Sequence, residues 1–296
     1  MHNPKAGDGG RLKKDLIDLI TSCDFSCTYV STKDKGWDRL KRKTTLVVVA
    51  GGDGTVRQLL KRLLKRRLID KRLTIAIVPL GTANNFAKTL HITASLPGLK
   101  QTLAKWHIKK IDIGAVGNLP EASFFLEGMG FGLMPALMET MKRIDRSAVK
   151  SADEELAFAM DQLINLAGMF EPRAGAVTID GVRHEGRYLM MEVLNTRSVG
   201  PNLVLAPDAD PTDGRLHAAL VKESDRGAFV AYLHELRSGM PFGQRRNVPC
   251  EVITVYHSLS MEGDHKLLHV DDEVIKIKKS RPLTVEVRAG IVDLLS

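Results

Sequence analysis

The chain has 296 residues, enough for two modest domains or one large one, and its hydrophobic fraction of 44% and charged fraction of 26% are ordinary for a globular protein. The lack of any run of about 18 apolar residues argues against a membrane span, and the polar first residues argue against a signal peptide. Three cysteines, an odd number without metal-ligand spacing, favour a reducing compartment, so we expect a cytoplasmic protein.

The formal net charge of +8 raises the question of an anionic partner. Between Arg57 and Arg72 lie eight basic residues and a single acid, Asp70, with leucines among them at helical spacing, which predicts an amphipathic basic helix. It is either a solvated outer face or a surface for peripheral contact with an anionic membrane, at the inner face of that membrane. Nucleic acid is disfavoured, because only 5% of the residues are aromatic and no recognition motif accompanies the charge.

The first hundred residues alternate between helical and strand patterns. The sequence predicts a helix over 11–23, an extended piece over 26–30, a buried strand over 46–50, the basic helix, a second buried strand over 73–78 and a helix from about Asn84. Short β-branched runs separated by helices are typical of βαβ units with a parallel sheet. One strand is missing from this pattern, because a polar Asn-Pro loop begins at residue 3, where a strand would normally precede it.

The second half has mostly hairpin signals. Strand patterns over 109–114, 176–179, 188–193, 252–256, 266–270 and 283–287 are interrupted by helical stretches at about 132–143, 153–169 and 225–238. This arrangement predicts a β-rich second domain after an open α/β domain. We expect the α/β domain over residues 1–108, with 281–296 as a segment that could return to it, and the second domain over 109–280.

Two glycine-containing loops follow the two buried strands. The first, Gly51-Gly52-Asp53-Gly54-Thr55, opens a helix, and its glycines let backbone N–H groups approach a phosphate. The second begins at Pro79 and reaches Thr82, which can donate to a phosphate, before Asn84 or Asn85 caps a helix. Both loops belong at the carboxyl edge of one sheet, where ligands bind in open α/β folds. No Gly-x-x-x-x-Gly-Lys-Ser/Thr motif is present, so a P-loop protein is excluded.

The order and spacing of these motifs resemble the diacylglycerol kinase catalytic family, which includes soluble bacterial lipid kinases and the sphingosine and ceramide kinases. The similarity rests on Asn-Pro-x-x-Gly from residue 3, Gly-Gly-Asp-Gly-Thr from residue 51 and Gly-Thr-Ala-Asn-Asn-Phe-Ala from residue 81. It continues through 112–114, 128–132, 213–214 and 271–273, and so covers nearly the whole chain. Gly-Gly-Asp-Gly-Thr by itself is shared with NAD kinases and phosphofructokinases.

The resemblance implies an ATP-dependent lipid kinase, a phosphotransferase that acts on the hydroxyl of a membrane lipid such as diacylglycerol. It also implies the fold, an α/β nucleotide-binding domain followed by a β-sandwich domain that carries the lipid-acceptor site. The residues that it implies for ATP contact are Asn3, Pro4, Lys5, Ala6, Gly7, Thr32, Gly51, Gly52, Asp53, Gly54, Thr55 and Thr82. It implies Mg²⁺ on a loop of the second domain, with a carboxylate from Asp213 and backbone oxygens of Asp210 and Arg215. It also implies Glu273 as the general base, with Asp271 and Asp53 as further catalytic acids.

Three positions depart from the family pattern. Arg57-Gln58 replaces the usual Asn-Glu, Asn85 stands where many members have Asp, and Asp272 replaces a glycine. Two other functions therefore stay open beside the lipid kinase. One is a kinase of a soluble metabolite, similar to NAD kinase, and the other is a catalytically silent module that binds nucleotide and lipid. The sequence identifies neither the acceptor lipid nor the oligomeric state.

Overall fold

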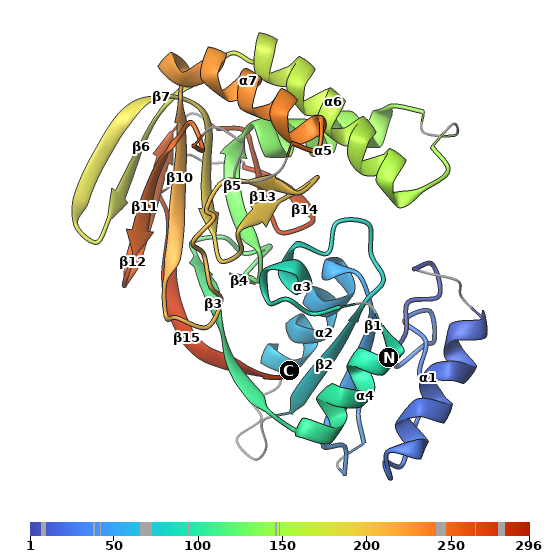
Figure 1. The fold of residues 1–296 in the computed structure, drawn as a ribbon. Coiled ribbons are helices and arrows are strands. Elements are labelled where there is room, and N and C mark those ends of the chain that lie inside the picture. Colours follow the sequence, from blue (N-terminus) through green and yellow to red (C-terminus); the bar gives the residue numbers. More distant parts are fainter. Residues whose placement is uncertain are drawn as a thin grey trace. The chain divides into compact units, whose positions relative to one another are not determined.

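The computed structural model describes residues 1–6, 10–37, 39–41, 43–65, 73–93, 95–145, 147, 149–240, 247–263, 265–277 and 282–296. The chain divides into two units, Met1–Ile111 together with Gly290–Ser296, and Asp112–Ala289 (Figure 1). It passes from one unit to the other within two strands, β3 (Ile108–Gly117) and β15 (Leu283–Leu295). None of the helices in the described ranges combines the length and apolar character needed to cross a bilayer.

The first unit is an α/β domain. Its elements are α1 (Gly10–Ser22), β1 (Leu46–Gly51), α2 (Asp53–Lys65), β2 (Thr74–Pro79), α3 (Asn85–Thr89), α4 (Leu96–Lys105) and the ends of β3 and β15 that belong to it. Strand β1 pairs with β2 in parallel from Leu46 opposite Thr74 to Gly51 opposite Pro79, and the end of β15 pairs in parallel with β2. The predicted parallel sheet is therefore confirmed.

Alternating side chains of these strands enter the helix layers. Ala50, Ala76 and Val78 form a buried cluster with Leu16 of α1 and with leucines of α4, while α2 packs against β1 and α3. Every residue of β2 is buried, which is the pattern of a parallel strand with both faces covered. The burial pattern explains why the sequence shows β1 and β2 as continuous apolar runs.

The first three residues take the place of the strand that the sequence lacks. His2 bridges in parallel to Ala50 on one side and to Ser31 on the other, and Asn3 N donates to Ala50 O at 2.9 Å. The predicted extended piece at 26–30 has no ladder of its own and is followed by this isolated bridge at Ser31. The predicted basic helix corresponds to α2 as far as Lys65, and its continuation to Arg72 lies outside the described residues.

The second unit is rich in antiparallel strands. Besides its parts of β3 and β15 it contains β4 (Phe124–Phe125), β5 (Gly128–Gly132), α5 (Leu133–Arg143), α6 (Ala152–Met169), β6 (Arg173–Ile179), β7 (Val182–Leu194), β8 (Ser198–Val199), β9 (Leu203–Val204), β10 (Leu216–Lys222), a short 3₁₀ turn η1 (Glu223–Asp225), α7 (Arg226–Arg237), β11 (Glu251–Val255), β12 (Ser258–Gly263), β13 (Leu267–Val270) and β14 (Glu273–Lys276).

The long strand β7 organises this unit. Its first half forms the predicted hairpin with β6 across the turn at Asp180 and Gly181, and β6 pairs onward with β12. Its second half lies between β10 and β5, and β5 pairs onward with β13. Consecutive residues of β7 point to opposite faces, so the strand contributes to two separate cores.

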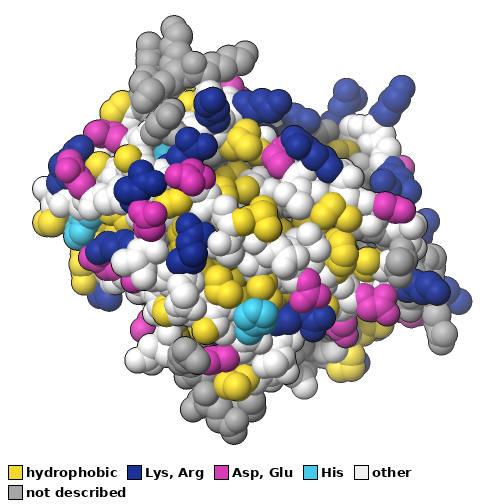
Figure 2. Space-filling model, turned by 90° about the horizontal axis from the view of Figure 1, so that it is seen from above, with side chains coloured by type: hydrophobic (Ala, Val, Ile, Leu, Met, Phe, Trp, Pro, Cys, Tyr) yellow, Lys and Arg dark blue, Asp and Glu magenta, His cyan; other side chains and the backbone are white. Residues whose placement is uncertain are grey.

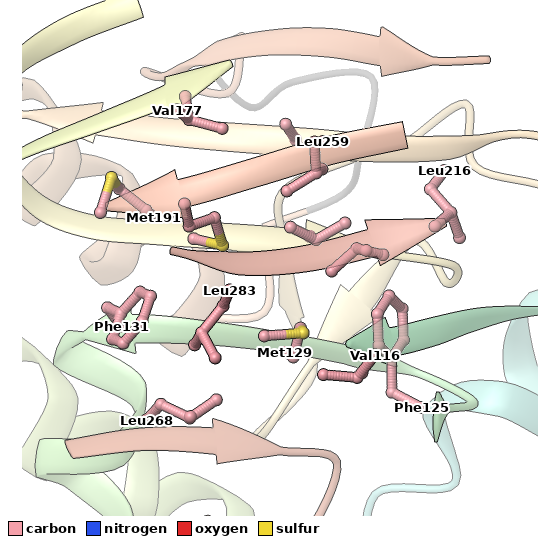
Figure 3. Close-up of a cluster of buried hydrophobic side chains, with 14 of the residues drawn as sticks. Val116, Phe125, Met129, Phe131, Val177, Met191, Leu216, Leu259, Leu268 and Leu283 are labelled. Atoms are coloured by element: carbon pink, nitrogen blue, oxygen red, sulfur yellow. The ribbon is translucent and has the colours of Figure 1, made fainter. Parts of the chain in front are cut away.

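One core is formed by side chains that strands of this unit direct toward one another, and the other lies between the strands and the helices. Figure 3 shows the first, in which Met129, Met191, Leu259 and Leu283 point toward one another from different strands. The second joins Met190 and other residues of β7 and β10 to α5, α6 and α7. Figure 2, which views the face that carries α6 and α7, shows basic, acidic and hydrophobic side chains mixed over it. The predicted class, an α/β domain followed by a β-sandwich domain, is thus confirmed.

Candidate active site

The two glycine loops of the first unit touch through their backbones. A Cβ added to Gly81 would lie 2.5 Å from the Cα of Gly52, and one added to Gly52 would lie 2.9 Å from the Cα of Gly81. Real side chains cannot occupy such space, so both positions require glycine. The loops follow adjacent parallel strands, as predicted, and Leu80 N donates to Gly51 O at 3.0 Å. The structure therefore brings both loops together at the carboxyl edge of the sheet.

Polar side chains connect these loops. Asp53, in the first turn of α2, accepts a hydrogen bond from Asn85 N through Oδ2 at 2.8 Å. Asn84, in the left-handed conformation at φ 52°, accepts from Gly81 N at 2.9 Å and donates to Gly81 O at 2.6 Å. Thr82, which follows Gly81 in the chain, is half-buried. The helix α2 begins directly behind Gly52, so its partial positive charge is directed at this edge.

The N-terminal loop reaches the first glycine loop through Asn3. Its Nδ2 donates to Thr55 Oγ1 at 3.3 Å, and its Oδ1 accepts from Lys5 N at 3.1 Å, which folds residues 3–6 into a turn. Thr32 N donates to His2 O at 2.9 Å, so the predicted residue Thr32 lies beside the same bridge. Gly7 lies outside the described residues. All other residues predicted for ATP contact belong to this group of loops.

The acidic triplet of the second unit forms a tight hairpin turn. Val270 pairs with Glu273, so Asp271 and Asp272 are the two turn residues between β13 and β14. Asp271 has φ 51° and is buried, whereas Asp272 is exposed and Glu273 is half-buried at the start of β14. The turn therefore presents Asp272 and Glu273 toward solvent to a greater extent than Asp271.

Asp271 fixes this turn to a neighbouring segment. Its carboxylate accepts hydrogen bonds from the backbone N–H groups of Leu126, Glu127 and Gly128, at distances between 2.8 and 3.2 Å. Its own N–H donates to Gly128 O at 2.8 Å. A carboxylate with several backbone donors is a strong anchor, because each of those bonds is charge-assisted.

The predicted metal loop is held by an aspartate that the sequence analysis assigned only to a motif. Gly214 N donates to Asp112 Oδ2 at 2.6 Å, and Asp112 N donates to Pro211 O at 2.7 Å. Within the loop, Asp213 Oδ1 accepts from Arg215 N at 2.9 Å. Nearby, burial lowers the pKa of His217, although Asp213 acts in the opposite direction. Across the described part of the chain, no three His, Cys, Asp or Glu side chains are grouped to hold a metal.

Asn195 links the metal loop to the acidic turn, and sequence reasoning missed it. Its Nδ2 donates to Asp112 O at 2.9 Å and to Leu126 O at 3.0 Å, while its N–H donates to Glu127 O at 2.8 Å. Asp112 holds the metal loop and the 126–128 segment holds Asp271, so a continuous set of hydrogen bonds joins the two predicted sites of this unit. A buried polar residue that ends the apolar run of β7 was the available signal.

A second pair was also missed. Glu192 and His269 are both fully buried, and His269 Nε2 lies 2.7 Å from Glu192 Oε2. Glu192 is the single acid in the otherwise apolar second half of β7, which is a detectable sequence signal.

Comparisons with known proteins give a consistent picture. A model described as the diacylglycerol kinase catalytic domain matches residues 1–116, and one described as the YegS C-terminal NAD kinase beta sandwich-like domain matches residues 139–296. The chain is similar to the diacylglycerol kinase of Bacillus subtilis (strain 168), with 27% identity over 211 residues, 71% of this chain and 64% of that protein.

Two further matches extend the comparison. The probable lipid kinase YegS-like of Shewanella frigidimarina (strain NCIMB 400) is 26% identical over 196 residues, 65% of this chain and 59% of that protein. The chain thus spans less than two thirds of the length of either curated relative. A crystal structure of a diacylglycerol kinase from Bacillus anthracis strain Sterne aligns with a TM-score of 0.73 and 22% identity over 99% of this chain and 94% of that one, which shows the likeness of fold.

Proposed function

Because the chain belongs to the family of diacylglycerol kinases and YegS-like lipid kinases, we propose that it transfers the γ-phosphate of ATP to the hydroxyl group of diacylglycerol or a related membrane lipid. The observation that carries this proposal is the backbone contact between Gly52 and Gly81. In this proposal the first unit binds the nucleotide and the second unit binds the lipid.

The loops of the first unit fit the phosphates of ATP. Glycine at both 52 and 81 keeps side-chain atoms out of the space between the loops, because a Cβ at either position would clash with the other glycine. The start of α2 supplies partial positive charge for an anion. Asp53 already accepts a hydrogen bond from Asn85 N, so its charge is partly compensated before any nucleotide binds. These features support phosphate binding at this edge of the sheet.

The loop from Asp210 to Arg215 fits Mg²⁺ by the chemistry of its donors. It has two carboxylates, and that of Asp210 already accepts hydrogen bonds from Thr212 N and Oγ1, so Asp213 would supply the carboxylate beside backbone oxygens. Oxygen ligands are those that this hard cation prefers. Asp112 holds the loop through Gly214 N. When bound, Mg²⁺ would supply positive charge within the second unit, which binds the lipid in this proposal. The assignment of Asp210, Asp213 and Arg215 stays a proposal.

Glu273 is the general base in this proposal. It accepts the proton of the lipid hydroxyl while the hydroxyl oxygen bonds to the γ-phosphorus, and the bond from that phosphorus to the bridging oxygen breaks, so ADP leaves. Its half-buried place at the start of β14 leaves the carboxylate accessible to a substrate. In this proposal Asp271 does not contact the substrate but fixes the turn that carries Glu273, because its carboxylate already accepts hydrogen bonds from three backbone N–H groups.

The test is phosphorylation of defined lipids by the purified chain. Mixed micelles that contain diacylglycerol, ceramide, sphingosine or a crude lipid extract are incubated with γ-³²P-labelled ATP and Mg²⁺, with NAD as a soluble acceptor in a parallel reaction. We expect labelled lipid with the wild type and with the matched control Glu121→Gln, an exposed glutamate, and its loss in Glu273→Gln. Labelled NADP in place of lipid, or equal labelling by Glu273→Gln, would contradict the proposal.

Peripheral contact with an anionic membrane stays a prediction. It rests on the basic side chains of α2, whose described part ends at Lys65. Sedimentation with vesicles of zwitterionic lipid, and with vesicles that also contain anionic lipid, tests it. Binding to both kinds of vesicle alike would exclude an electrostatic contact.

A further inference from the structure

Four strands align four residues in one row on the helix-covered face of the second unit. Ala219 of β10 lies opposite Glu192 of β7, Glu192 lies opposite Gly130 of β5, and Gly130 lies opposite His269 of β13. The neighbours Met129, Met191 and Leu268 point into the core between the strands, so the row points to the other face. Within this row the two titratable side chains flank a glycine.

Gly130 lets the two side chains meet. A Cβ at this position would overlap the carboxyl group of Glu192, so only glycine leaves room for that group above β5. The carboxyl group extends across the strand to His269, whose Nε2 lies 2.7 Å from Glu192 Oε2. Ala219, on the other side of Glu192, is also a small residue, so both direct neighbours of Glu192 in the row leave space for its side chain.

His269 passes this contact on to the acidic turn. Its second ring nitrogen, Nδ1, lies 3.0 Å from the carbonyl oxygen of Asp271. A carbonyl oxygen only accepts, so Nδ1 carries a proton. The imidazole therefore donates a hydrogen bond to the backbone of Asp271. The side chain of Asp271 accepts hydrogen bonds from the backbone N–H groups of residues 126–128. Glu273 follows two residues later, as the first residue of β14.

Burial of both groups favours a pair that carries no net charge. Both side chains have no exposed surface, and Glu192 Oε1 has no hydrogen-bond partner among the described residues, so a lone charge on either group would be costly. Burial raises the pKa of Glu192. Burial opposes the charged form of His269, but the facing Glu192 carboxylate and the contacts with Asp271 together favour it, so the pKa of His269 is also raised. Besides the proton on Nδ1, the two groups therefore share one proton in the contact between Nε2 and Oε2.

We propose that His269 is a positioning residue for phosphoryl transfer, which holds the β13–β14 turn so that Glu273 stays aligned with the attacking hydroxyl, and that Glu192 supports its imidazole from the other side. This inference rests on the proposed lipid kinase function with Glu273 as the base. The pair touches neither substrate nor phosphate in this role. It acts through the carbonyl of Asp271, and a displacement of about 1 Å in a reacting group costs on the order of a hundredfold in rate.

Two substitutions of one residue separate the two contacts. In His269→Asn the amide nitrogen lies near the place of Nδ1 and can still donate to Asp271 O, while the contact with Glu192 is lost. In His269→Gln the amide lies near the place of Nε2, so Glu192 keeps a partner and the turn loses its donor. We expect kcat for the lipid to fall at least about tenfold in His269→Gln and no more than about threefold in His269→Asn, with KM for ATP unchanged in both.

A double-mutant cycle with Glu273→Gln tests whether His269→Gln acts through Glu273 or through a general loss of folding. If the pair acts through Glu273, adding His269→Gln to Glu273→Gln lowers the residual rate no further, because the base that it aligns is already gone. A merely structural role predicts instead that both His269 variants lose activity in proportion to their loss of folded protein, measured by thermal unfolding, and that the losses multiply in the double variant. Either of these results overturns the inference.

A measurement on the wild type needs no variant. Two-bond ¹H–¹⁵N spectra of histidine-labelled protein report which ring nitrogen carries a proton, and we expect a proton on Nδ1 of His269. An unprotonated Nδ1 overturns the inference. If the wild type labels no lipid at all, the proposed function fails and this inference fails with it. If the wild type labels lipid and the two His269 variants match it, only the positioning role fails.

Discussion

The carboxylate of Asp53 accepts a hydrogen bond of 2.8 Å from the backbone N–H of Asn85, which joins the start of helix α2 to the start of helix α3. Asn85 is buried, so water cannot readily replace the carboxylate as the acceptor of this N–H. We expect Asp53→Ala to lower the free energy of unfolding by about 1 to 3 kcal/mol, because the donor loses its charged acceptor. Urea unfolding of the variant measures this loss.

The matched variant Asp53→Asn separates structure from charge. Its side-chain oxygen can still accept from Asn85 N, so we expect a stability within about 1 kcal/mol of the wild type. Lipid phosphorylation should nevertheless fall at least about tenfold in both variants, since the proposed catalytic role requires the negative charge. Full activity of Asp53→Asn would remove Asp53 from the catalytic residues.

Gly81→Ala should abolish most of the phosphorylation. The added Cβ lies 2.5 Å from the Cα of Gly52, so the two loops must separate. We expect kcat/KM for ATP to fall on the order of a hundredfold. The control is Gly227→Ala in α7, where an added Cβ meets nothing within 4 Å and the helix gains up to about 1 kcal/mol. Equal effects of the two variants would argue against a phosphate role for the loop contact.

Asp271→Ala should destabilise the second unit. It removes the shared acceptor of three backbone N–H groups and places alanine at φ 51°. We expect a loss of roughly 3 kcal/mol or more in the free energy of unfolding. Asp271→Asn keeps one acceptor oxygen and tolerates the left-handed conformation, so it should lose less.

The comparison for this prediction is Asp153→Ala, an exposed position in the first turn of α6. It should cost no more than about 1 kcal/mol. Thermal unfolding, followed by circular dichroism, ranks the three variants. The anchor role of Asp271 fails if its alanine variant is as stable as Asp153→Ala.

Cys250 should resist thiol reagents in the native protein. Burial raises the pKa of its thiol to about 12, so the reactive thiolate is scarce at about pH 8, whereas an ordinary cysteine is partly ionised there. In a variant with Cys23 and Cys27 changed to serine, we expect labelling of Cys250 to be at least about a hundredfold slower in the native than in the unfolded state. Similar rates in both states would contradict the burial of this thiol.

The local pattern of the sequence determined most of the elements. Continuous apolar runs predicted β1 and β2, because both faces of those strands are covered, and the Asp-Gly turn predicted the hairpin of β6 and β7. Helical spacing predicted α1, α5, α6 and α7 to within a few residues. The glycines at 51, 52 and 81 predicted the two loops, because the backbone freedom of glycine is a property of the residue itself.

Only the tertiary structure decided how distant residues cooperate. The missing strand is replaced by a bridge from His2 to Ala50, which depends on a register that no local pattern encodes. Asn195 joins Asp112 to Leu126, and Glu192 meets His269 across Gly130, because strands far apart in the sequence pair in one register. The glycine loop from Gly51 to Thr55, which first indicated phosphate chemistry, was visible in the sequence. Its contact with Gly81 and the anchoring of the acidic turn arise from pairing between distant segments. Side-chain type alone does not specify that pairing.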